Sequence, residues 1–199
     1  GVTEIRADIS TSGNQTYHDA VELDTPADTV TLTADGDIVF QQTLRSLTDG
    51  EEQVIVNADG VTRFVGDVGD NSQRLRRLET DSDGAAGTTE IGANIDTVGT
   101  VEALRFGDDV LLINGPVVLT TTASGVVPSA ADVVFERTLN GSQNLTLSIE
   151  GETTFTGAVG ANNAIGTNTG AAITINSTGP TEFQSTVQTA SGIAQDDAA

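Results

Sequence analysis

The sequence predicts an all-β protein that folds as a parallel β-helix, or β-solenoid, with coils of about 20–28 residues. Three observations predict this fold. The composition, with 22 glycines and only 4% aromatic residues, suits short strands joined by tight turns. No long apolar stripe with the 3.6-residue period of a helix is present. Short motifs recur in the same order along the chain, and bulky apolar residues recur at the spacing of solenoid coils.

Three motifs occur twice, in the same order. The paired segments, with the offset between copies, are TEIRADI (residues 3–9) and TEIGANI (89–95), 86 residues; DIVFQQTL (37–44) and DVVFERTL (132–139), 95 residues; and GVTRFVGDVG (60–69) and GETTFTGAVG (151–160), 91 residues. GPTEFQSTV (179–187) is a weaker third copy of the last motif. The conserved order indicates repeated architecture, and the varying offset indicates loops of different length.

Bulky residues mark a shorter period within these repeats. Phe40 precedes Phe64 by 24 residues, and Phe135 precedes Phe155 by 20. Apolar residues alternate with polar ones around each of them, as in a strand with one buried face. We expect the core to be formed by Ile5, Ile9, Phe40, Phe64, Val68, Ile91, Ile95, Phe135, Phe155, Val159 and Phe183. A β-sandwich would explain the strands and turns, but it would not explain this spacing.

Each predicted strand is a short alternating segment, and turn sequences such as ADGD, NADG, LNGS and STGP separate the strands. In chain order the predicted strands are residues 3–9, 15–23, 29–33, 37–40, 53–56, 62–68, 88–95, 109–113, 117–122, 132–135, 144–149, 153–159, 172–176 and 181–187. The repeats divide the chain into a first solenoid repeat, 1–86, and a second repeat with longer loops, 87–199. We expect one continuous solenoid that extends beyond both ends, because the terminal DDAA reads as a lead-in to GVTEIRADI.

The segment TEIRADISTSGNQTYHDAVEL, followed by GVTRFVGDVG, resembles the repeat arrays of filamentous-haemagglutinin-like bacterial adhesins. The carriers of the resemblance are Thr3, Ile5, Ala7, Ile9, Thr11, Gly13, Gln15, Tyr17, Val21 and Leu23, with Thr89, Ile91, Ala93, Ile95, Thr97 and Gly99 in the second copy. The second copy departs at TVEALRFGDDV, where Gln and Tyr are missing. The resemblance implies a right-handed parallel β-helix within a giant secreted or surface-anchored protein.

The charge of the chain excludes several classes of partner. A net charge of −21 argues against nucleic acid and against an anionic membrane surface, since both would repel the protein. No apolar run is long enough to span a bilayer, so we expect no membrane insertion in this segment. The absence of cysteine excludes disulfides and thiolate metal sites.

Enzyme chemistry has little support in the sequence. The only histidine, His18, lies beside Asp19 and Tyr17, and a lone surface histidine is the plainer interpretation. Polysaccharide lyases and hydrolases with β-helix folds use clustered carboxylates or a basic residue on an exposed sheet. Here the acidic residues fall mainly in turns, and the cluster Arg74, Arg76 and Arg77 is expected to form surface ion pairs. We therefore expect no enzyme activity and no cofactor other than a cation.

Calcium is the one cofactor for which the sequence offers candidate ligands, and otherwise we expect none. In ETDSDG, Asp81 and Asp83 lie two residues apart before a glycine, as in the first half of an EF-hand loop. The rest of that loop is missing, since Ala85 and Ala86 stand where ligands are needed. GDVGDNS and FGDDV offer further carboxylates, although Asp and Asn are also common in turns for conformational reasons. Sequons for N-glycosylation occur at Asn14, Asn140, Asn144 and Asn176.

These observations predict a structural segment of an extracellular or cell-surface fibre or stalk. A coil cannot bury its apolar face alone, so neighbouring coils complete one another, and the expected partner is the protein itself. The alternatives are a carbohydrate-binding module that contacts surface glycans and a polysaccharide-active enzyme. Aromatic residues in an exposed groove would favour sugar binding, and clustered carboxylates with a base would favour catalysis.

Overall fold

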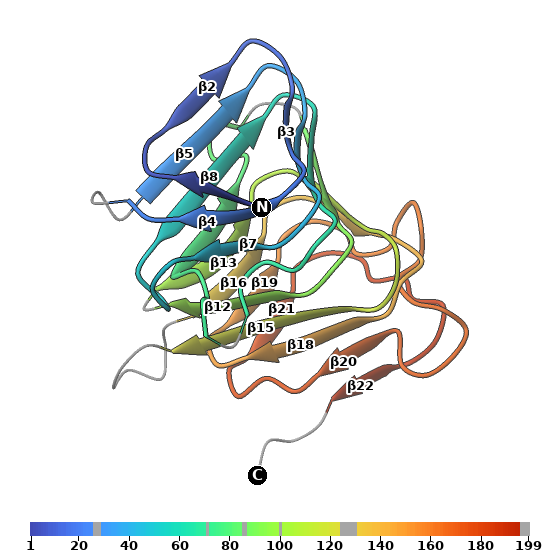
Figure 1. Cartoon of the computed structure of the whole chain (residues 1–199). Helices are drawn as coiled ribbons and strands as arrows, with labels where there is room; N and C mark the ends of the chain where they lie inside the picture. The colour runs from blue at the N-terminus through green and yellow to red at the C-terminus, as the bar shows by residue number, and fades with distance from the viewer. Residues whose placement is uncertain (26–28, 71, 85–86, 100, 124–130, 196–199) are drawn as a thin grey trace.

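The chain winds through about seven turns of a parallel β-solenoid, which confirms the predicted fold class (Figure 1). The computed structural model describes residues 1–25, 29–70, 72–84, 87–99, 101–123 and 131–195. The predicted lead-in at residues 196–199 lies outside these ranges, as do Ala85 and Ala86. Within the described part, every strand pairing is parallel and joins successive coils. Each full coil contributes one segment to each of three sides of the solenoid, here called faces 1, 2 and 3.

Face 2 carries the longest sheet. Its order is β2 (Ile9–Thr11), β5 (Thr29–Ala34), β8 (Gln53–Ala58), β10 (Arg77–Thr80), β13 (Glu102–Phe106), β16 (Asp132–Phe135), β19 (Thr153–Phe155) and β21 (Thr181–Phe183). Face 3 consists of β3 (Gln15–Tyr17), β6 (Ile38–Phe40), β9 (Val61–Phe64), β11 (Thr88–Ile91), β14 (Asp109–Leu112) and β17 (Leu139–Asn140), continued by bridges at Val159 and Val187.

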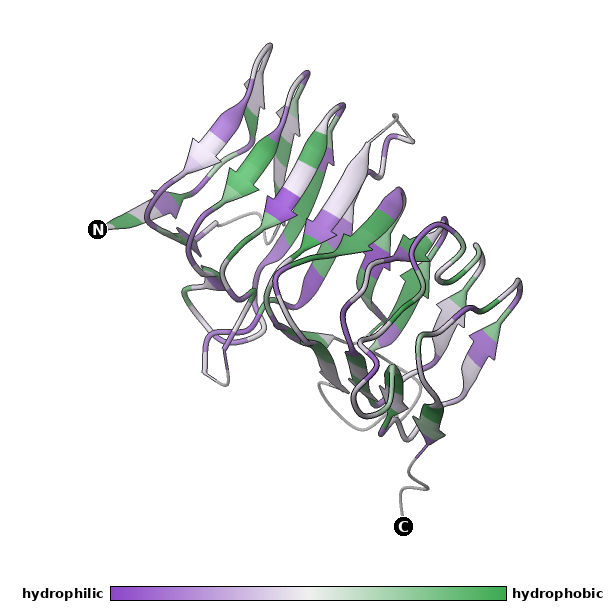
Figure 2. Cartoon of the chain, turned by 90° about the vertical axis from the view of Figure 1, so that its right-hand side faces the viewer, coloured by the Kyte–Doolittle hydropathy of each residue, from purple (hydrophilic) through white to green (hydrophobic). Residues whose placement is uncertain are grey.

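Face 1 is formed by two sheets that a single-residue bridge joins. The first contains β1 (Val2–Ile5), β4 (Ala20–Leu23) and β7 (Leu44–Ser46); the second contains β12 (Ile95–Gly99), β15 (Val117–Ala123), β18 (Leu145–Ile149), β20 (Ile173–Ile175) and β22 (Ile193–Gln195). Val68 pairs with Leu44 on one side and with Ile95 on the other, so it holds the place of a strand in the coil between them. Figure 2 shows the coils lying side by side along the stack.

The core runs along the solenoid axis and is filled by the inward side chains of all three faces. Alternate residues are buried along most strands, as in β5 and β18. Two stacks of aromatic rings form within the core: Tyr17, Phe40 and Phe64 on face 3, and Phe106, Phe135, Phe155 and Phe183 on face 2. Of the residues expected in the core, the structure buries nine, whereas Ile9 and Phe183, in β2 and β21, are partly buried.

The register of the strands reproduces the spacing of the bulky residues. Phe40 lies opposite Phe64, and Phe64 lies opposite Ile91. Phe135 lies opposite Phe155 in the same way. The residues that mark the shorter period are therefore paired along two ladders, one on face 3 and one on face 2, and each spacing is the length of one coil.

Several predicted strands are wrong in extent, because the chain bends within them. Residues 3–9 form β1 and β2, residues 88–95 form β11 and β12, and residues 62–68 form β9 and the bridge at Val68. The alternation of buried and outward residues continues through each bend, so it does not reveal the bend. A glycine occupies the bend where coils approach closely: a Cβ on Gly66 would lie 2.5 Å from the main-chain carbonyl carbon of Gln42.

The two copies of each long motif lie on different faces. β1 lies on face 1, whereas its copy, β11, lies on face 3. β6 and β9 lie on face 3, whereas their copies, β16 and β19, lie on face 2. In each case the second copy comes eleven segments later, counting the bridge at Val68 as one. With three segments to a coil, the motifs repeat after three and two-thirds turns. The face 2 sheet crosses the predicted boundary at residues 86 and 87 without a break, and the division there stays a prediction.

Candidate functional site

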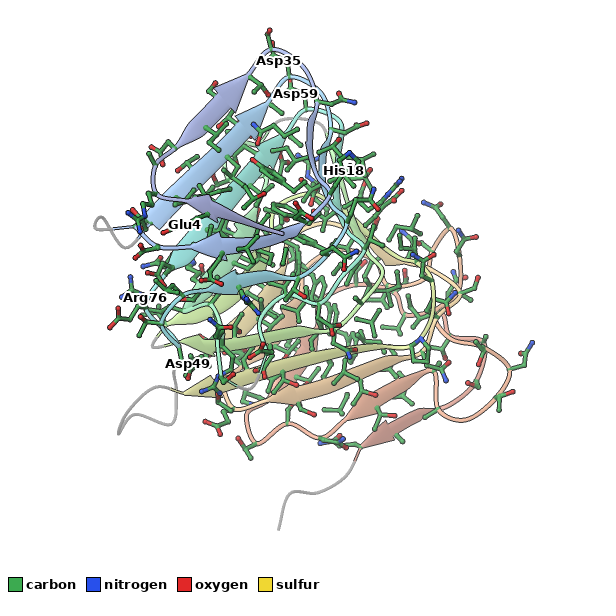
Figure 3. All side chains as sticks on the ribbon, in the orientation of Figure 1. Glu4, His18, Asp35, Asp49, Asp59 and Arg76 are labelled. Atoms are coloured by element: carbon green, nitrogen blue, oxygen red, sulfur yellow. The ribbon has the colours of Figure 1, made fainter. Side chains whose placement is uncertain are left out.

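The edge between faces 2 and 3 carries aspartates in successive coils. Figure 3 labels the first two, Asp35 and Asp59, and both are exposed. The next two, Asp81 and Asp108, are buried, with 3% and 2% of their surface exposed. We call the pair Asp81 and Asp108 the buried Asp pair. The main chain beside them is tightly stacked, since the Gly107 N–H donates to the Thr80 carbonyl over 2.9 Å.

Two threonines hold Asp108 in place. Thr89 Oγ1 donates to Asp108 Oδ1 over 2.7 Å and lies 2.9 Å from Thr80 Oγ1, which is 3.3 Å from the same carboxylate oxygen. Both threonines are fully buried. Burial raises the pKa of Asp108, and the hydrogen bonds from the two hydroxyls oppose that rise. In the sequence, Thr89 is one of the alternating residues of a predicted strand, and nothing there indicates a hydrogen bond to Asp108. The bond forms because one coil stacks on the next.

The carboxylate of Asp81, unlike that of Asp108, accepts no hydrogen bond from an N–H or hydroxyl group of the described residues. Both of its carboxylate oxygens are buried, and neither has a hydrogen-bond partner among the described residues. Its main chain adopts a positive φ of 54°, and its own N–H donates to the Val56 carbonyl over 2.9 Å. Burial raises the pKa of Asp81 to about 6, and the neighbouring Asp108 and Asp83 carboxyls contribute to the rise, while Arg137 opposes it.

The structure brings the predicted cation ligands together and adds another carboxylate. Asp81 and Asp83 interact, and the carboxyl of Asp108, from the next coil, lies near enough to help raise the pKa of Asp81. Asp83 itself is exposed, whereas the buried Asp pair is not. Across the described residues, no group of three or more His, Cys, Asp or Glu side chains is arranged to hold a metal ion. A cation at this edge would therefore take part of its coordination from main-chain oxygens and water.

The predicted basic cluster lies on the other edge of face 2, near the start of β10. Arg74 pairs with Asp49 at 2.7 Å, and Arg77 pairs with Glu79 at 2.9 Å and with Glu102 at 3.1 Å. These contacts bear out the expected ion pairs for Arg74 and Arg77, whereas Arg76 forms no ion pair among the described residues. The pairs of Arg74 with Asp49 and of Arg77 with Glu102 are partly exposed to water and contribute little stability by themselves, whereas Glu79 is buried.

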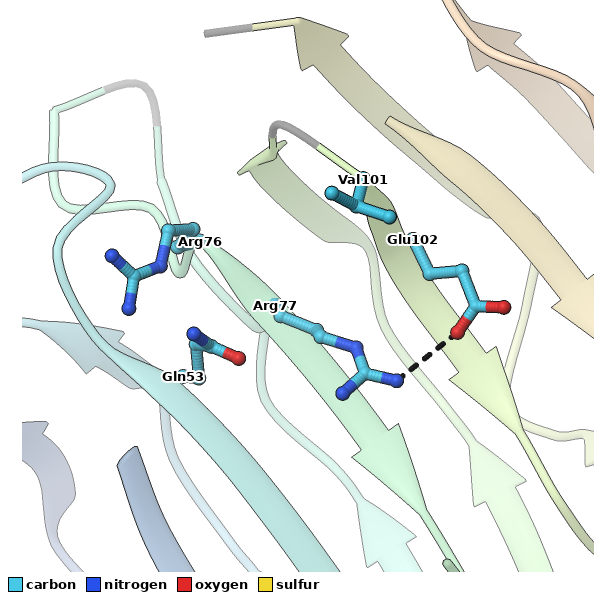
Figure 4. A pocket seen from close by; sticks show the side chains of 5 residues that line it. All are labelled: Gln53, Arg76, Arg77, Val101 and Glu102. Carbon is cyan, nitrogen blue, oxygen red and sulfur yellow. Dashed lines mark hydrogen bonds and ion pairs between the residues drawn. The ribbon is translucent and has the colours of Figure 1, made fainter. Parts of the chain in front are cut away.

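A shallow hollow of about 300 Å³ opens beside this cluster (Figure 4). Its lining includes Arg76, Arg77 and Gln53, together with Val101, which is 70% exposed, and Glu102. With the Gln53 carboxamide oxygen turned toward Arg76, that oxygen accepts hydrogen bonds from Nη2 at 2.7 Å and from Nε at 3.2 Å. Both arginines of the hollow therefore have partners within the chain.

Asp and Asn side chains at the bends join each coil to the next. In every case a side-chain oxygen accepts a hydrogen bond of 2.7–3.0 Å from a backbone N–H one coil further on. We call these contacts Asx staples. The acceptors are Asp8, Asn14, Asp37, Asp49, Asn57, Asp67, Asn94, Asp109, Asp132, Asn140 and Asn144. Three of the four sequon asparagines are among them, and the fourth, Asn176, is exposed after β20.

His18 lies exposed at the bend between β3 and β4 (Figure 3).

Comparison of the chain with protein-family models, with curated proteins and with solved structures gives no match. Among the described residues, no helix has the length and apolar character needed to cross a membrane. What these residues and contacts establish is a β-solenoid repeat protein with a buried acidic pair at one edge.

Proposed function

We propose that the chain is a structural segment of an extracellular or cell-surface fibre or stalk, of the kind that filamentous-haemagglutinin-like adhesins form. The observation that carries the proposal is the continuity of the stack. One sheet of eight strands on face 2 extends from β2 to β21, with main-chain hydrogen bonds directed along the solenoid axis. A stack of this kind transmits load from coil to coil through many parallel hydrogen bonds.

The side chains add to this continuity. The two aromatic stacks place one ring on another at centroid distances of 4.7–5.3 Å, so that a ring in one coil packs on the ring of the next. The Asx staples tie the bends of successive coils together. Both kinds of contact act between coils and not within them, which suits a rod better than a binding domain.

The surface charge fits a rod that stays separate from its neighbours. Acidic residues outnumber basic ones by 29 to 8. Six of the eight arginines form ion pairs with carboxylates within the chain. Most of the remaining acidic side chains face water, and their charge repels other copies laterally.

Electron microscopy of the native material tests the proposal, because it should show thin filaments. Fibre diffraction from aligned material should give a meridional reflection at about 4.7–4.9 Å, the spacing of strands along the axis. Isolated globular particles, or a reflection of that spacing perpendicular to the filament, would contradict the fibre model.

A glycan-binding module is the second candidate. A polar hollow of about 230 Å³ on face 3, lined by Asp109, Thr138, Asn140 and Asn163 among others, offers the amide and hydroxyl groups that sugars use. Binding of the chain to a glycan array, lost on Asp109→Ala and retained on Asp59→Ala, would favour this candidate. The absence of binding would leave the structural role as the better account.

A further inference from the structure

We propose that the buried Asp pair, Asp81 and Asp108, binds a calcium ion at the edge between faces 2 and 3. The inference goes beyond the proposed structural role, because it assigns a cation site that fastens one coil to the next. Asp81 follows β10 and Asp108 follows β13, so an ion held by both would join two successive coils.

The first argument is the state of the Asp81 carboxylate. Both oxygens are buried without an N–H or hydroxyl donor among the described residues, and the side chain that does interact with them, Asp83, is another acid. A buried carboxylate without a hydrogen bond or a counter-charge is strongly unfavourable, and such groups in proteins are paired or coordinate a metal. Arg137, the cation that acts on Asp81, is itself exposed to water. A bound cation would supply the missing partner.

The second argument is that oxygen atoms gather beside Asp108. At Gly87 the main chain lies so close to the neighbouring coils that only a glycine fits. A Cβ there would lie 2.7 Å from the Ala58 carbonyl oxygen, 3.1 Å from the Gly60 carbonyl oxygen and 3.4 Å from Asp108 Oδ2. Three oxygens from the two coils on either side of Gly87 therefore lie close to one point, and one of them belongs to the carboxylate that Thr89 orients.

The donor set indicates calcium and not a softer metal. All candidate ligands are oxygens, from carboxylates, main-chain carbonyls and water, and the chain contains no cysteine. Calcium accepts six to eight such ligands in flexible geometry, whereas magnesium requires near-octahedral coordination and keeps most of its water. A site with only two buried carboxylates suits calcium, because carbonyls and water can complete its shell.

The same edge provides a matched control. Asp59 precedes Gly60 one coil before Asp81, and it is exposed. Asp59→Asn removes one negative charge from the same edge without touching the buried Asp pair. Asp81→Asn removes the proposed ligand and keeps the side-chain shape, and asparagine tolerates the positive φ at this position.

The experiment is isothermal titration with CaCl2 at pH 7.5, together with thermal melts in CaCl2 and in EDTA. Wild type and Asp59→Asn should bind one calcium ion per chain. Their Tm should rise by roughly 5–10 °C at a hundredfold excess of calcium over Kd. Asp81→Asn and Asp108→Asn should lose both the heat and the rise in Tm. In EDTA, Asp81→Asn should melt above wild type, because it no longer buries an unpaired carboxylate.

Two results would overturn the proposal. One is a wild-type Tm that is equal in calcium and in EDTA, with no saturable heat. The other is a calcium response that Asp81→Asn and Asp59→Asn share, which would indicate diffuse attraction to the acidic surface. Neither result bears on the filament model, which microscopy tests separately.

Discussion

Replacing Phe135 with alanine should destabilise the solenoid more than the same change at Phe183. Phe135 is 1% exposed, and its ring stacks on Phe106 at 4.9 Å and on Phe155 at 4.7 Å. Truncating a buried phenylalanine to alanine costs about 3–5 kcal/mol. Each of its two aromatic pairs contributes about 0.5–1.5 kcal/mol beyond burial, so the total is about 4–8 kcal/mol.

Phe183 provides the comparison, because it stacks on Phe155 alone at 4.8 Å and is only partly buried. We expect Phe183→Ala to cost less than half as much. For a chain of this size, about 5 kcal/mol corresponds to a fall in Tm of roughly 10–20 °C. Circular dichroism melts measure both variants, and Phe135→Leu separates the stacking contribution from the cavity. Equal losses for Phe135→Ala and Phe183→Ala would refute the continuous ring stack.

Three further predictions concern polar contacts. Asp37→Ala removes the Asx staple to the Val61 N–H at 2.9 Å and should cost about 0.5–2 kcal/mol in urea unfolding, whereas Asp59→Ala should change stability by less than about 0.5 kcal/mol. The raised pKa of Asp81 stabilises the folded state at low pH. In EDTA that contribution should disappear as the pH rises through about 6, and Asp81→Asn should flatten this part of the Tm–pH profile. Arg105→Ala breaks pairs with Glu79, Glu102 and Glu136, so its cost should shrink as salt increases; a salt-independent cost would point to lost packing instead.

The sequence predicts the coil spacing well, because large side chains must stack on one another. Phe40, Phe64 and Ile91 are opposite one another in the register, and their spacing could be read directly. The bends could not be placed, because alternation continues through them. The sequence analysis did not predict β10 and β13. Both strands carry charged residues on their outward face, such as Arg77 and Arg105, so their sequences look like those of surface loops.

The candidate site was predicted only in part. Asp81 and Asp83 are neighbours in the chain, so their pairing follows from local spacing. Asp108 lies 27 residues later and reaches Asp81 only because one coil stacks on the next. The Asx staples also join residues of different coils. Once the coil length is known they can be predicted, because Asn14 and Asp37 are separated in the sequence by the length of one coil.

The displacement of the repeated motifs by three and two-thirds turns has a consequence for recognition. The two copies of each motif are related by a screw operation, which combines a net rotation of two-thirds of a turn in the winding direction with an axial shift of roughly 18 Å at the usual strand spacing. Equivalent bends therefore point in different directions around the axis and do not form a row along one edge. A rigid partner with two binding arms would have to wrap around the rod to engage both copies.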